Sequence, residues 1–484
     1  MKNILSLILL FTCLLVHAQK SDTVRLSLTD VVAMARERSI AALQARTVKE
    51  TRYWEWRTHR SNYQPQLLLK GTAPAYTKSY IPVVQPNGAI DFLPVHNNNS
   101  SLSLAFSQSI AATGGRIFGT TELQRFDDFD RNNTLYSGVP YGIGYAQPLF
   151  RFNQLKWDNR TEPLKYQESK QQYIESMEEV AITASNYFFE QLLAQVNLQI
   201  AEANLSNTQN ILRIANEKFD MGKIAHNEIL QLQLEELKSL KAVATARRDI
   251  EIANLNLKAY AGLQDEARIE LLVPDKVSNV RIDHHKVLDE AYANRSDAIA
   301  FVRRALEARR DVVKARAENG INATLTARVG FTNSSSSFSK VYQSPKTQEL
   351  VQLEFDIPIL DWGRSRSRTK TAEAVQKFTE YALKQDRQNF MQEIVTEVTL
   401  FDMMKAQLQL TRRADSIATE KYGIARDRYV LGKLSITDLS IAFQEKDQAK
   451  RDYVYMLRDY WKAYYRLRYL SLYDFEQQKK IAYP

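Results

Sequence analysis

The stretch KFDMGKI at residues 218–224 returns as RYVLGKL at residues 428–434, and this doubled turn decides the fold. The agreement extends far from the turn itself. A proline precedes each turn glycine by 74 positions, in the pairs Pro148 and Gly222, and Pro358 and Gly432. Register kept over such a span indicates an internal tandem repeat.

Long runs almost without helix breakers lead up to both turns. Residues 154–219 contain no glycine, and residues 365–429 contain only Gly423. The whole chain has 15 glycines and 12 prolines in 484 residues, well under the usual share of a globular protein. We therefore predict two very long helices, of which the first would extend roughly 99 Å at 1.5 Å per residue.

Apolar residues recur every three or four positions in these runs and in the segments that follow the turns. This spacing is typical of coiled-coil seams, and an ordinary helical bundle would explain the spacing but not the length. The predicted seams are Leu230, Leu234, Leu237, Leu240 and Ala244 after the first turn, and Met391, Ile394, Val398, Phe401 and Leu408 before the second.

The regions rich in Gly, Pro, Asn and Ser, residues 65–148 and 320–363, carry strand patterns in which apolar and polar residues alternate. Strands are predicted at residues 66–72, 141–147, 321–331 and 351–359, with an additional hairpin formed by residues 101–107 and 115–123.

Such strands belong either to a soluble sheet or to the wall of a membrane barrel with lipid on one side. Two strands in each repeat cannot close a barrel. Open sheet edges in lipid would leave unpaired backbone groups that cost several kcal/mol each. If these strands cross a bilayer, several chains must therefore share one barrel.

Residues 1–18 are predicted to be a cleaved secretory signal. Lys2 precedes an apolar segment, residues 4–16, that is too short to cross a hydrocarbon core, which needs roughly 20 residues. Cleavage is expected after Ala18, where small residues follow the apolar segment. The alternative is a lipid anchor on Cys13, the only cysteine. Without that residue the mature chain has no thiol for disulfides, nucleophilic catalysis or metal binding.

Composition and motifs exclude several classes of function. The 65 basic and 56 acidic residues are spread along the chain, so no nucleic-acid partner is expected. The adjacent His284 and His285 cannot share a helix face, and Gly142 with Gly144 lacks the third glycine of a dinucleotide loop. Nothing gathers a nucleophile, a base and an oxyanion site, so we predict no enzyme, no cofactor and no metal site.

The order of these segments resembles the TolC family of outer-membrane efflux proteins. The resemblance rests on a strand-to-helix junction at residues 357–364, a helix start at 291–297 and the end of the last helix at 472–475. Ser296 stands where the family's helix-start motif has proline, and Arg38-Ser39 where Asn-Pro is common. The similarity covers nearly the whole chain after the predicted signal.

This resemblance implies a mostly α protein with a membrane β-barrel, in which long coiled-coil-like helical hairpins form a tandem repeat. Each chain would supply four strands to a twelve-stranded barrel shared by a homotrimer. The channel would lie in outer-membrane lipid with a periplasmic helical tunnel. It would be the passive exit duct of an efflux or type I secretion system, joined by a periplasmic adaptor protein to an inner-membrane pump.

The resemblance also assigns roles at the two turns. There the hairpin tips form the periplasmic entrance and contact the adaptor, through Met221, Gly222, Lys223, Leu431, Gly432 and Lys433. Asp438 matches a family position whose carboxylates form an acidic ring at the closed entrance, and Glu228 is its counterpart in the first repeat. Tyr429 matches a tyrosine that latches this entrance. Plain helix capping would equally explain the glycines, and a helix-dipole contact would explain Asp438.

The predicted organisation is a signal, two repeats and a short tail. The signal covers residues 1–18 and the tail 476–484. The first repeat covers 19–283, with strands in 66–148, helices at 154–219 and 225–262, and a linker at 263–283. The second repeat covers 284–475, with strands in 321–359 and helices at 363–429 and 435–471. A structural coiled-coil protein of the surface or periplasm is the alternative function. It would explain the seams but not paired amphipathic strands repeated at a fixed shift.

Overall fold

The computed structural model of the chain describes residues 24–263, 269–274 and 282–483. The predicted signal, residues 1–18, and part of the predicted linker, residues 263–283, lie outside this range.

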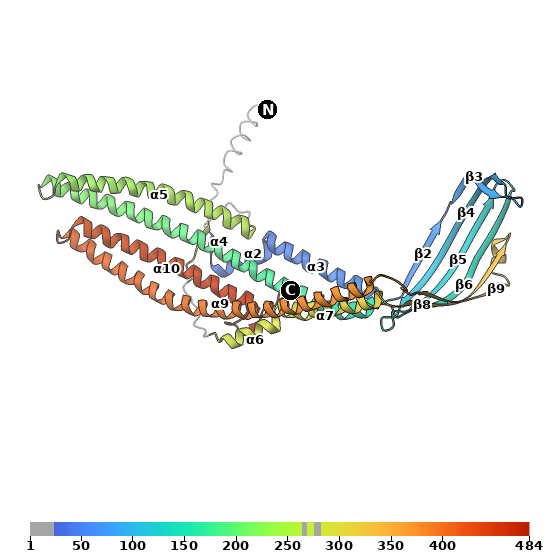
Figure 1. Cartoon of the computed structure of the whole chain (residues 1–484). Coiled ribbons are helices and arrows are strands. Elements are labelled where there is room, and N and C mark those ends of the chain that lie inside the picture. Colours follow the sequence, from blue (N-terminus) through green and yellow to red (C-terminus); the bar gives the residue numbers. More distant parts are fainter. Residues whose placement is uncertain (1–23, 264–268, 275–281, 484) are drawn as a thin grey trace, which may run out of the picture. The chain divides into compact units, whose positions relative to one another are not determined.

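Two helices of 67 residues dominate the structure, α4 at Gln154–Asp220 and α9 at Arg364–Val430. Each is roughly 100 Å long at 1.5 Å per residue. Each turns back at the repeated motif into a helix of 36 residues, α5 at His226–Ala261 and α10 at Ile436–Ser471. Figure 1 shows the two resulting hairpins, green and orange to red. The predicted class, mostly helical with long paired hairpins, is confirmed.

The remaining helices are shorter: α2 at Leu28–Arg38, α3 at Ile40–Ser61, α6 at His284–Asn294, α7 at Ser296–Glu318 and α8 at Phe338–Val341. A capping box starts α2, because Ser27 accepts a hydrogen bond from the Asp30 backbone and the Asp30 carboxylate accepts one from Ser27. Extended residues separate α2 from α3 at Ser39, and α6 from α7 at Arg295.

The largest sheet is antiparallel and has seven strands in the order β2-β4-β5-β6-β8-β9, with β3 also paired to β4. Its strands are β2 at Gln66–Thr72, β3 at Tyr76–Val84, β4 at Ile90–Ser109, β5 at Arg116–Asp128, β6 at Asn133–Leu149, β8 at Asn322–Ser335 and β9 at Lys346–Asp356. Two small sheets pair β1 (Val24–Leu26) with β7 (Ile269–Leu271), and β10 (Tyr473–Asp474) with β11 (Lys479–Lys480).

Side chains alternate between the two faces of the large sheet, and directly paired residues share a face. One face, the apolar face, carries Leu67, Leu69, Leu102, Leu104, Phe106, Ile117, Leu123, Ile143, Leu325, Val329, Val351, Leu353 and Phe355. The opposite, polar face carries Lys70, Ser103, Glu122, Arg328, Gln352 and Glu354. One apolar and one polar face are typical of a wall between lipid and water.

The strand count corrects the expectation of four strands per chain. The predicted additional hairpin, residues 101–107 and 115–123, lies within β4 and β5, and both strands are part of the continuous sheet. The reason is pairing on both edges: β4 pairs with β2 on one side and with β5 along 13 residues on the other.

The chain divides into two compact units that do not follow the two sequence repeats. Of the described residues, the first unit contains 24–49, 170–263, 269–274, 282–298 and 388–483, and the second contains 50–169 and 299–387. Each unit therefore takes part of both repeats, and the division into repeats stays a prediction. None of the helices among the described residues is long and apolar enough to span a membrane.

The predicted seams divide into buried and exposed stripes. Val243 and Ala246 of α5 are buried against α4, as are Ile229 and Leu232. On α9 the seam is buried except for Met391. The α5 seam is different, because all of its predicted members are exposed in the single chain: Leu230, Leu234, Leu237, Leu240 and Ala244. The apolar spacing correctly located a stripe of leucines, but α4 packs on the adjacent stripe of α5 that contains Leu232 and Val243.

A buried charge cluster joins several elements of the first unit. Glu178 on α4 is fully buried and accepts hydrogen bonds from Arg36 Nη2 at 2.7 Å and Arg468 Nε at 3.0 Å. The Tyr483 hydroxyl also donates to Glu178, and Arg468 pairs in addition with Asp474. Burying one carboxylate is tolerable here because two guanidinium groups and a hydroxyl compensate it.

Removing that central charge should destabilise the first unit strongly. Glu178→Gln leaves Arg36 and Arg468 short of their shared counter-charge, and we expect a loss of about 3–5 kcal/mol. The matched control is Glu270→Gln, which breaks the exposed 2.9 Å pair with Arg25 and should cost less than about 1 kcal/mol. Denaturant unfolding of detergent-solubilised protein measures both. Equal losses in the two variants would contradict this account of the cluster.

Candidate functional site at the hairpin turns

Both hairpin turns have the same backbone geometry. The helix before each turn ends in a left-handed glycine, with φ of +70° at Gly222 and +71° at Gly432. The Gly222 N–H donates to the Phe219 carbonyl at 2.7 Å, and the Lys223 N–H donates to the Lys218 carbonyl at 2.9 Å. This pair of bonds is the Schellman motif, which satisfies carbonyls that would otherwise be orphaned at the helix end.

The second turn repeats these bonds at the shift of 210 residues. The Gly432 N–H donates to the Tyr429 carbonyl at 2.9 Å, and the Lys433 N–H donates to the Arg428 carbonyl at 2.9 Å. Glycine is needed because other residues rarely adopt the left-handed conformation. The two turns are therefore similar in sequence because both form the same Schellman motif with a left-handed glycine.

Apolar side chains stand exposed beside both glycines. Met221 is 59% exposed and Leu431 is 69% exposed, and the lysines that follow the glycines are also exposed. Among the described residues, nothing lies within 4 Å of a Cβ placed on either glycine. Each turn thus presents an open surface of backbone, one large apolar side chain and one cation.

The helices that leave the turns begin differently. Ser435 caps α10 by accepting a hydrogen bond from the Asp438 N–H at 3.1 Å, and its hydroxyl donates to the exposed Asp438 carboxylate at 2.7 Å. Ala225 stands at the same place before α5 and makes no side-chain cap, while Glu228 is half-buried. The structure therefore gives Asp438 a capping role within one chain, and the predicted acidic ring stays a prediction.

Tyr429 lies almost at the end of α9 and is only 7% exposed. It packs in a cluster with Tyr422, Ala425, Leu439 and Ala442. Burial raises the pKa of the Tyr429 hydroxyl, and the negative charge of Glu228 raises it further. Tyr429 and Glu228 are thus brought together within one chain, although they belong to different hairpins.

Lys218 of α4 reaches across to the second hairpin. Its ammonium group lies 4.9 Å from the centre of the Tyr429 ring and donates to the Tyr429 backbone carbonyl at 3.5 Å. A cation over an aromatic face is attracted by the ring quadrupole. Sequence reasoning missed Lys218, because a lysine near a helix end is an ordinary feature.

A second polar contact between the hairpins lies deeper. The Asn204 side-chain amide on α4 donates to the Asp447 carboxylate on α10 at 2.6 Å, and Asp447 is buried. Lys446 is a further partner of that carboxylate, at 3.3 Å. The sequence held no signal for this pair, because 243 positions separate its two members.

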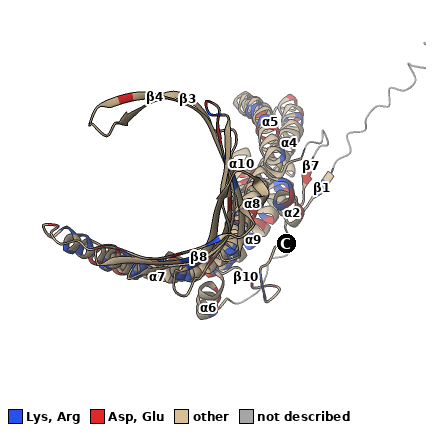
Figure 2. Cartoon of the chain, turned by 90° about the vertical axis from the view of Figure 1, so that its right-hand side faces the viewer, with Lys and Arg blue, Asp and Glu red and all other residues tan. Residues whose placement is uncertain are grey.

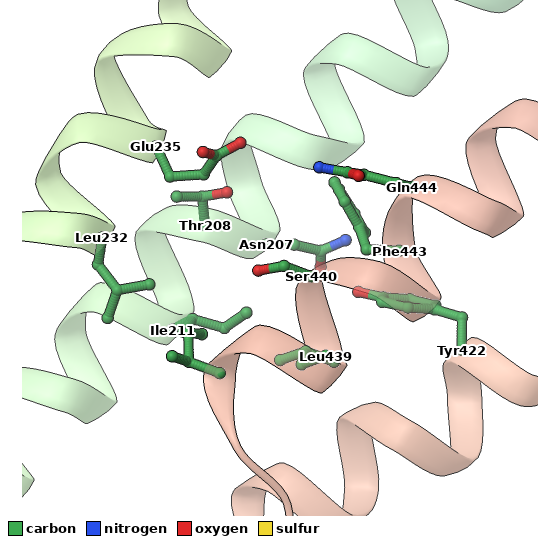
Figure 3. A pocket seen from close by; sticks show the side chains of 11 residues that line it. Asn207, Thr208, Ile211, Leu232, Glu235, Tyr422, Leu439, Ser440, Phe443 and Gln444 are labelled. Atoms are coloured by element: carbon green, nitrogen blue, oxygen red, sulfur yellow. The ribbon is translucent and has the colours of Figure 1, made fainter. Parts of the chain in front are cut away.

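Between these two contacts lies a small cleft bounded by all four hairpin helices, shown in Figure 3. Ile211, Leu232, Leu439 and Phe443 form its apolar part. Polar side chains line the remainder: Asn207, Thr208, Glu235, Ser440 and Gln444. No group of three or more His, Cys, Asp or Glu able to hold a metal ion occurs in the described ranges.

Comparison with known proteins places this arrangement in a family. The outer membrane efflux protein family matches residues 117–263 and 287–471, more than half of the chain. No curated protein matches the sequence.

Solved structures share the fold at low identity. A membrane protein from Pseudomonas aeruginosa has a TM-score of 0.66 at 16% identity, with 93% of this chain and 91% of that chain covered. The Campylobacter jejuni CmeC outer membrane channel has a TM-score of 0.65 at 15% identity, covering 92% and 85%. The Vibrio cholerae outer membrane protein VceC has a TM-score of 0.61 at 14% identity, covering 92% and 95%.

The shared turn geometry gives a test with an internal control. Gly222→Ala and Gly432→Ala place a Cβ in the left-handed region and should each destabilise their turn by about 1–2 kcal/mol. Gly423→Ala lies inside α9 with open space around it, and should stabilise that helix by about 0.5–1 kcal/mol. Hydrogen exchange of the tip peptides should quicken in the first two variants and slow in the third. Slower exchange in all three would refute the strained-turn explanation.

Proposed function

Because the chain belongs to the outer membrane efflux protein family, it is a subunit of an outer-membrane channel with a periplasmic helical part, and we propose that three copies form one passive exit duct. An inner-membrane pump would supply the energy, and a periplasmic adaptor would join pump and duct. Efflux and type I secretion both fit this role.

The observation that carries the proposal is the two-faced sheet of a single chain. Its apolar face is exposed from β2 to β9, and its end strands are unpaired along their outer edges in the single chain. Exposed apolar strands with free edges are stable in a bilayer only after closure with other copies. The exposed α5 seam supports the same conclusion for the helical part, because a leucine stripe of this period fits a neighbouring helix.

The hairpin tips are the proposed adaptor contact. Met221 and Leu431 can be buried by a partner, and the adjacent backbone leaves room for close approach because no side chain projects from either glycine. Lys223 and Lys433 add one positive charge to each tip, which favours an acidic or polar partner surface. The cleft between the hairpins lies next to this surface and offers an apolar groove for the same partner.

We assign the closed state of the entrance to the contacts that join the two hairpins. Lys218 holds the end of α9 through Tyr429, and Asn204 holds α10 through Asp447. Both contacts must separate if one hairpin swings away from the other. The first is partly exposed and the second buried, so the tip end should yield first.

The acidic ring is proposed at Asp438, with Glu228 as its counterpart on the first hairpin. Asp438 is exposed, and its carboxylate accepts a hydrogen bond from the uncharged Ser435 hydroxyl, a contact that leaves its negative charge in place. Three such carboxylates around a threefold axis would attract cations into the entrance.

Neutralising this ring should change how cations block the channel. Asp438→Asn keeps an oxygen that can accept from Ser435 but removes the charge, so helix capping survives. We expect the concentration of a multivalent cation needed for half-block in planar bilayers to rise at least about tenfold. Ser435→Ala is the control, because it removes the cap and keeps the charge, and its block should match the wild type. Unchanged block in Asp438→Asn would refute the ring, whereas a failure of the wild type to form channels would refute the duct.

Charging the tips should separate the duct from its adaptor. Met221→Asp combined with Leu431→Asp replaces two apolar anchors, and we expect the adaptor recovered with detergent-extracted channel to fall about tenfold or more. Lys479→Asp, in the exposed short strand β11, is the control and should recover as much adaptor as wild type. Both variants should remain trimeric in outer membranes. Undiminished recovery in the tip variant would move the contact elsewhere.

A further inference from the structure

We propose that each chain contributes six strand positions to the shared barrel, so that three chains close a wall of eighteen strands by pairing β9 of one copy with β2 of the next. This inference rests on the proposed trimer. It replaces the twelve-stranded wall expected from the resemblance with a wider one.

The seven strands occupy six positions because β2 and β3 lie end to end on one edge of β4. β2 pairs with residues 101–107 of β4, and β3 pairs with residues 90–98 of the same strand. Asn97 and Asn98 pair with β3 and also with β5, so β3 and β5 lie on opposite edges of β4. The free edge of the sheet on this side is therefore a single line made by β2 and then β3.

The hairpin β2–β4 carries the same pattern as the rest of the wall. On the apolar face, Leu69 pairs with Leu104, which in turn pairs with Thr121 of β5, and Leu67 pairs with Phe106. The leucines and Phe106 are exposed in the single chain. A hairpin that lined the channel interior or stood in water would have no reason to continue this apolar band in register, so β2 and β4 belong to the lipid-facing wall.

The polar face has the crowding expected of a concave surface. A Cβ on Gly144 would meet the Phe118 ring at 2.3 Å, and one on Gly142 would lie 3.3 Å from the Arg328 guanidinium. Side chains converge on the inside of a closed sheet, where small residues beside large ones make room. Figure 2 shows this sheet as a curved wall. The polar face is thus the lumen side, and the apolar face is the lipid side.

The two free edges fit each other in direction. All neighbours along the path β2-β4-β5-β6-β8-β9 are antiparallel, so six positions place β2 and β9 in opposite directions. β9 of one copy therefore meets β2 of the next as an antiparallel pair, and the even count closes the ring without a mismatch. All residues of β2 and of β9 are exposed in the single chain, as an unfilled pairing edge requires.

A twelve-stranded wall would require this chain to discard structure. To bring β9 against β5, the hairpin β2–β4 must leave the sheet, and all 13 residues of β5 would lose their partners from Asn97 to Ser109. In lipid each unpaired backbone group costs several kcal/mol. Because barrel diameter grows roughly linearly with strand number, the wall proposed here is about 1.5-fold wider than a twelve-stranded one. The outer exit then admits bulkier hydrophilic cargo.

Disulfide cross-linking in outer membranes decides between the two closures. The background is Cys13→Ser, which removes the only cysteine. Leu69→Cys is combined in turn with Val351→Cys, Leu353→Cys and Phe355→Cys, because strand register slides in steps of two when one face must stay apolar. At least one combination should give covalent dimers and trimers on mild oxidation. The comparison set uses Thr121→Cys of β5 with the same three β9 positions, and should give none.

The control for oxidation is Leu104→Cys with Thr121→Cys, which are register partners within one chain and should link without any change in chain number. Intermolecular products from Thr121 and not from Leu69 would overturn the eighteen-stranded wall and leave the trimeric duct intact. Intrachain linkage alone, in protein that is monomeric by native mass, would overturn the wall and the duct together.

Discussion

The structure depends on one constraint, that backbone groups at a sheet edge in lipid must find partners. A single chain leaves β2 and β9 exposed along their full lengths, while the four strands between them are paired on both edges. Nothing within the large sheet can fill these edges, because its two ends are the ends of one curved wall. Assembly is therefore part of folding for this region, and membrane insertion and closure should be coupled.

The helical part was the more predictable half because its signals are local. Gly222 and Gly432 mark helix ends through a conformation that depends only on the residues around them. Helix length follows from the scarcity of breakers between residues 154 and 219, where there is no glycine and Pro163 lies within three turns of the helix start. What spacing could not supply was the partner of each stripe. Leu234 and Leu237 have coiled-coil spacing, but α4 packs on Leu232 and leaves these two leucines exposed. A heptad pattern marks an apolar stripe without showing which helix packs on it.

The sheet was harder to predict, and residues 96–100 explain why. Their sequence, HNNNS, reads as a loop because Asn and Ser disfavour strands, but all five lie within β4. Pairing with neighbours on both edges outweighs the weak local preference, and those neighbours are known only once the sheet exists. The same limit hid Lys218 beside Tyr429 and Asn204 beside Asp447, where contact joins positions more than two hundred residues apart.

The first unit combines a strongly held region with weakly joined hairpin ends. Around the fully buried Glu178, two arginines and the Tyr483 hydroxyl form a cluster, and separating them would leave the Glu178 charge uncompensated in the interior. Toward the turns, the hairpins are joined by Lys218 on Tyr429, by Asn204 on Asp447 and by a small apolar cleft. The free energy needed to separate the two hairpins is therefore smallest at their tips. An adaptor that buries Met221 and Leu431 would bind at the end where the fewest contacts between the hairpins must be broken. The cluster at Glu178 would stay intact, as the fixed end about which the hairpins move.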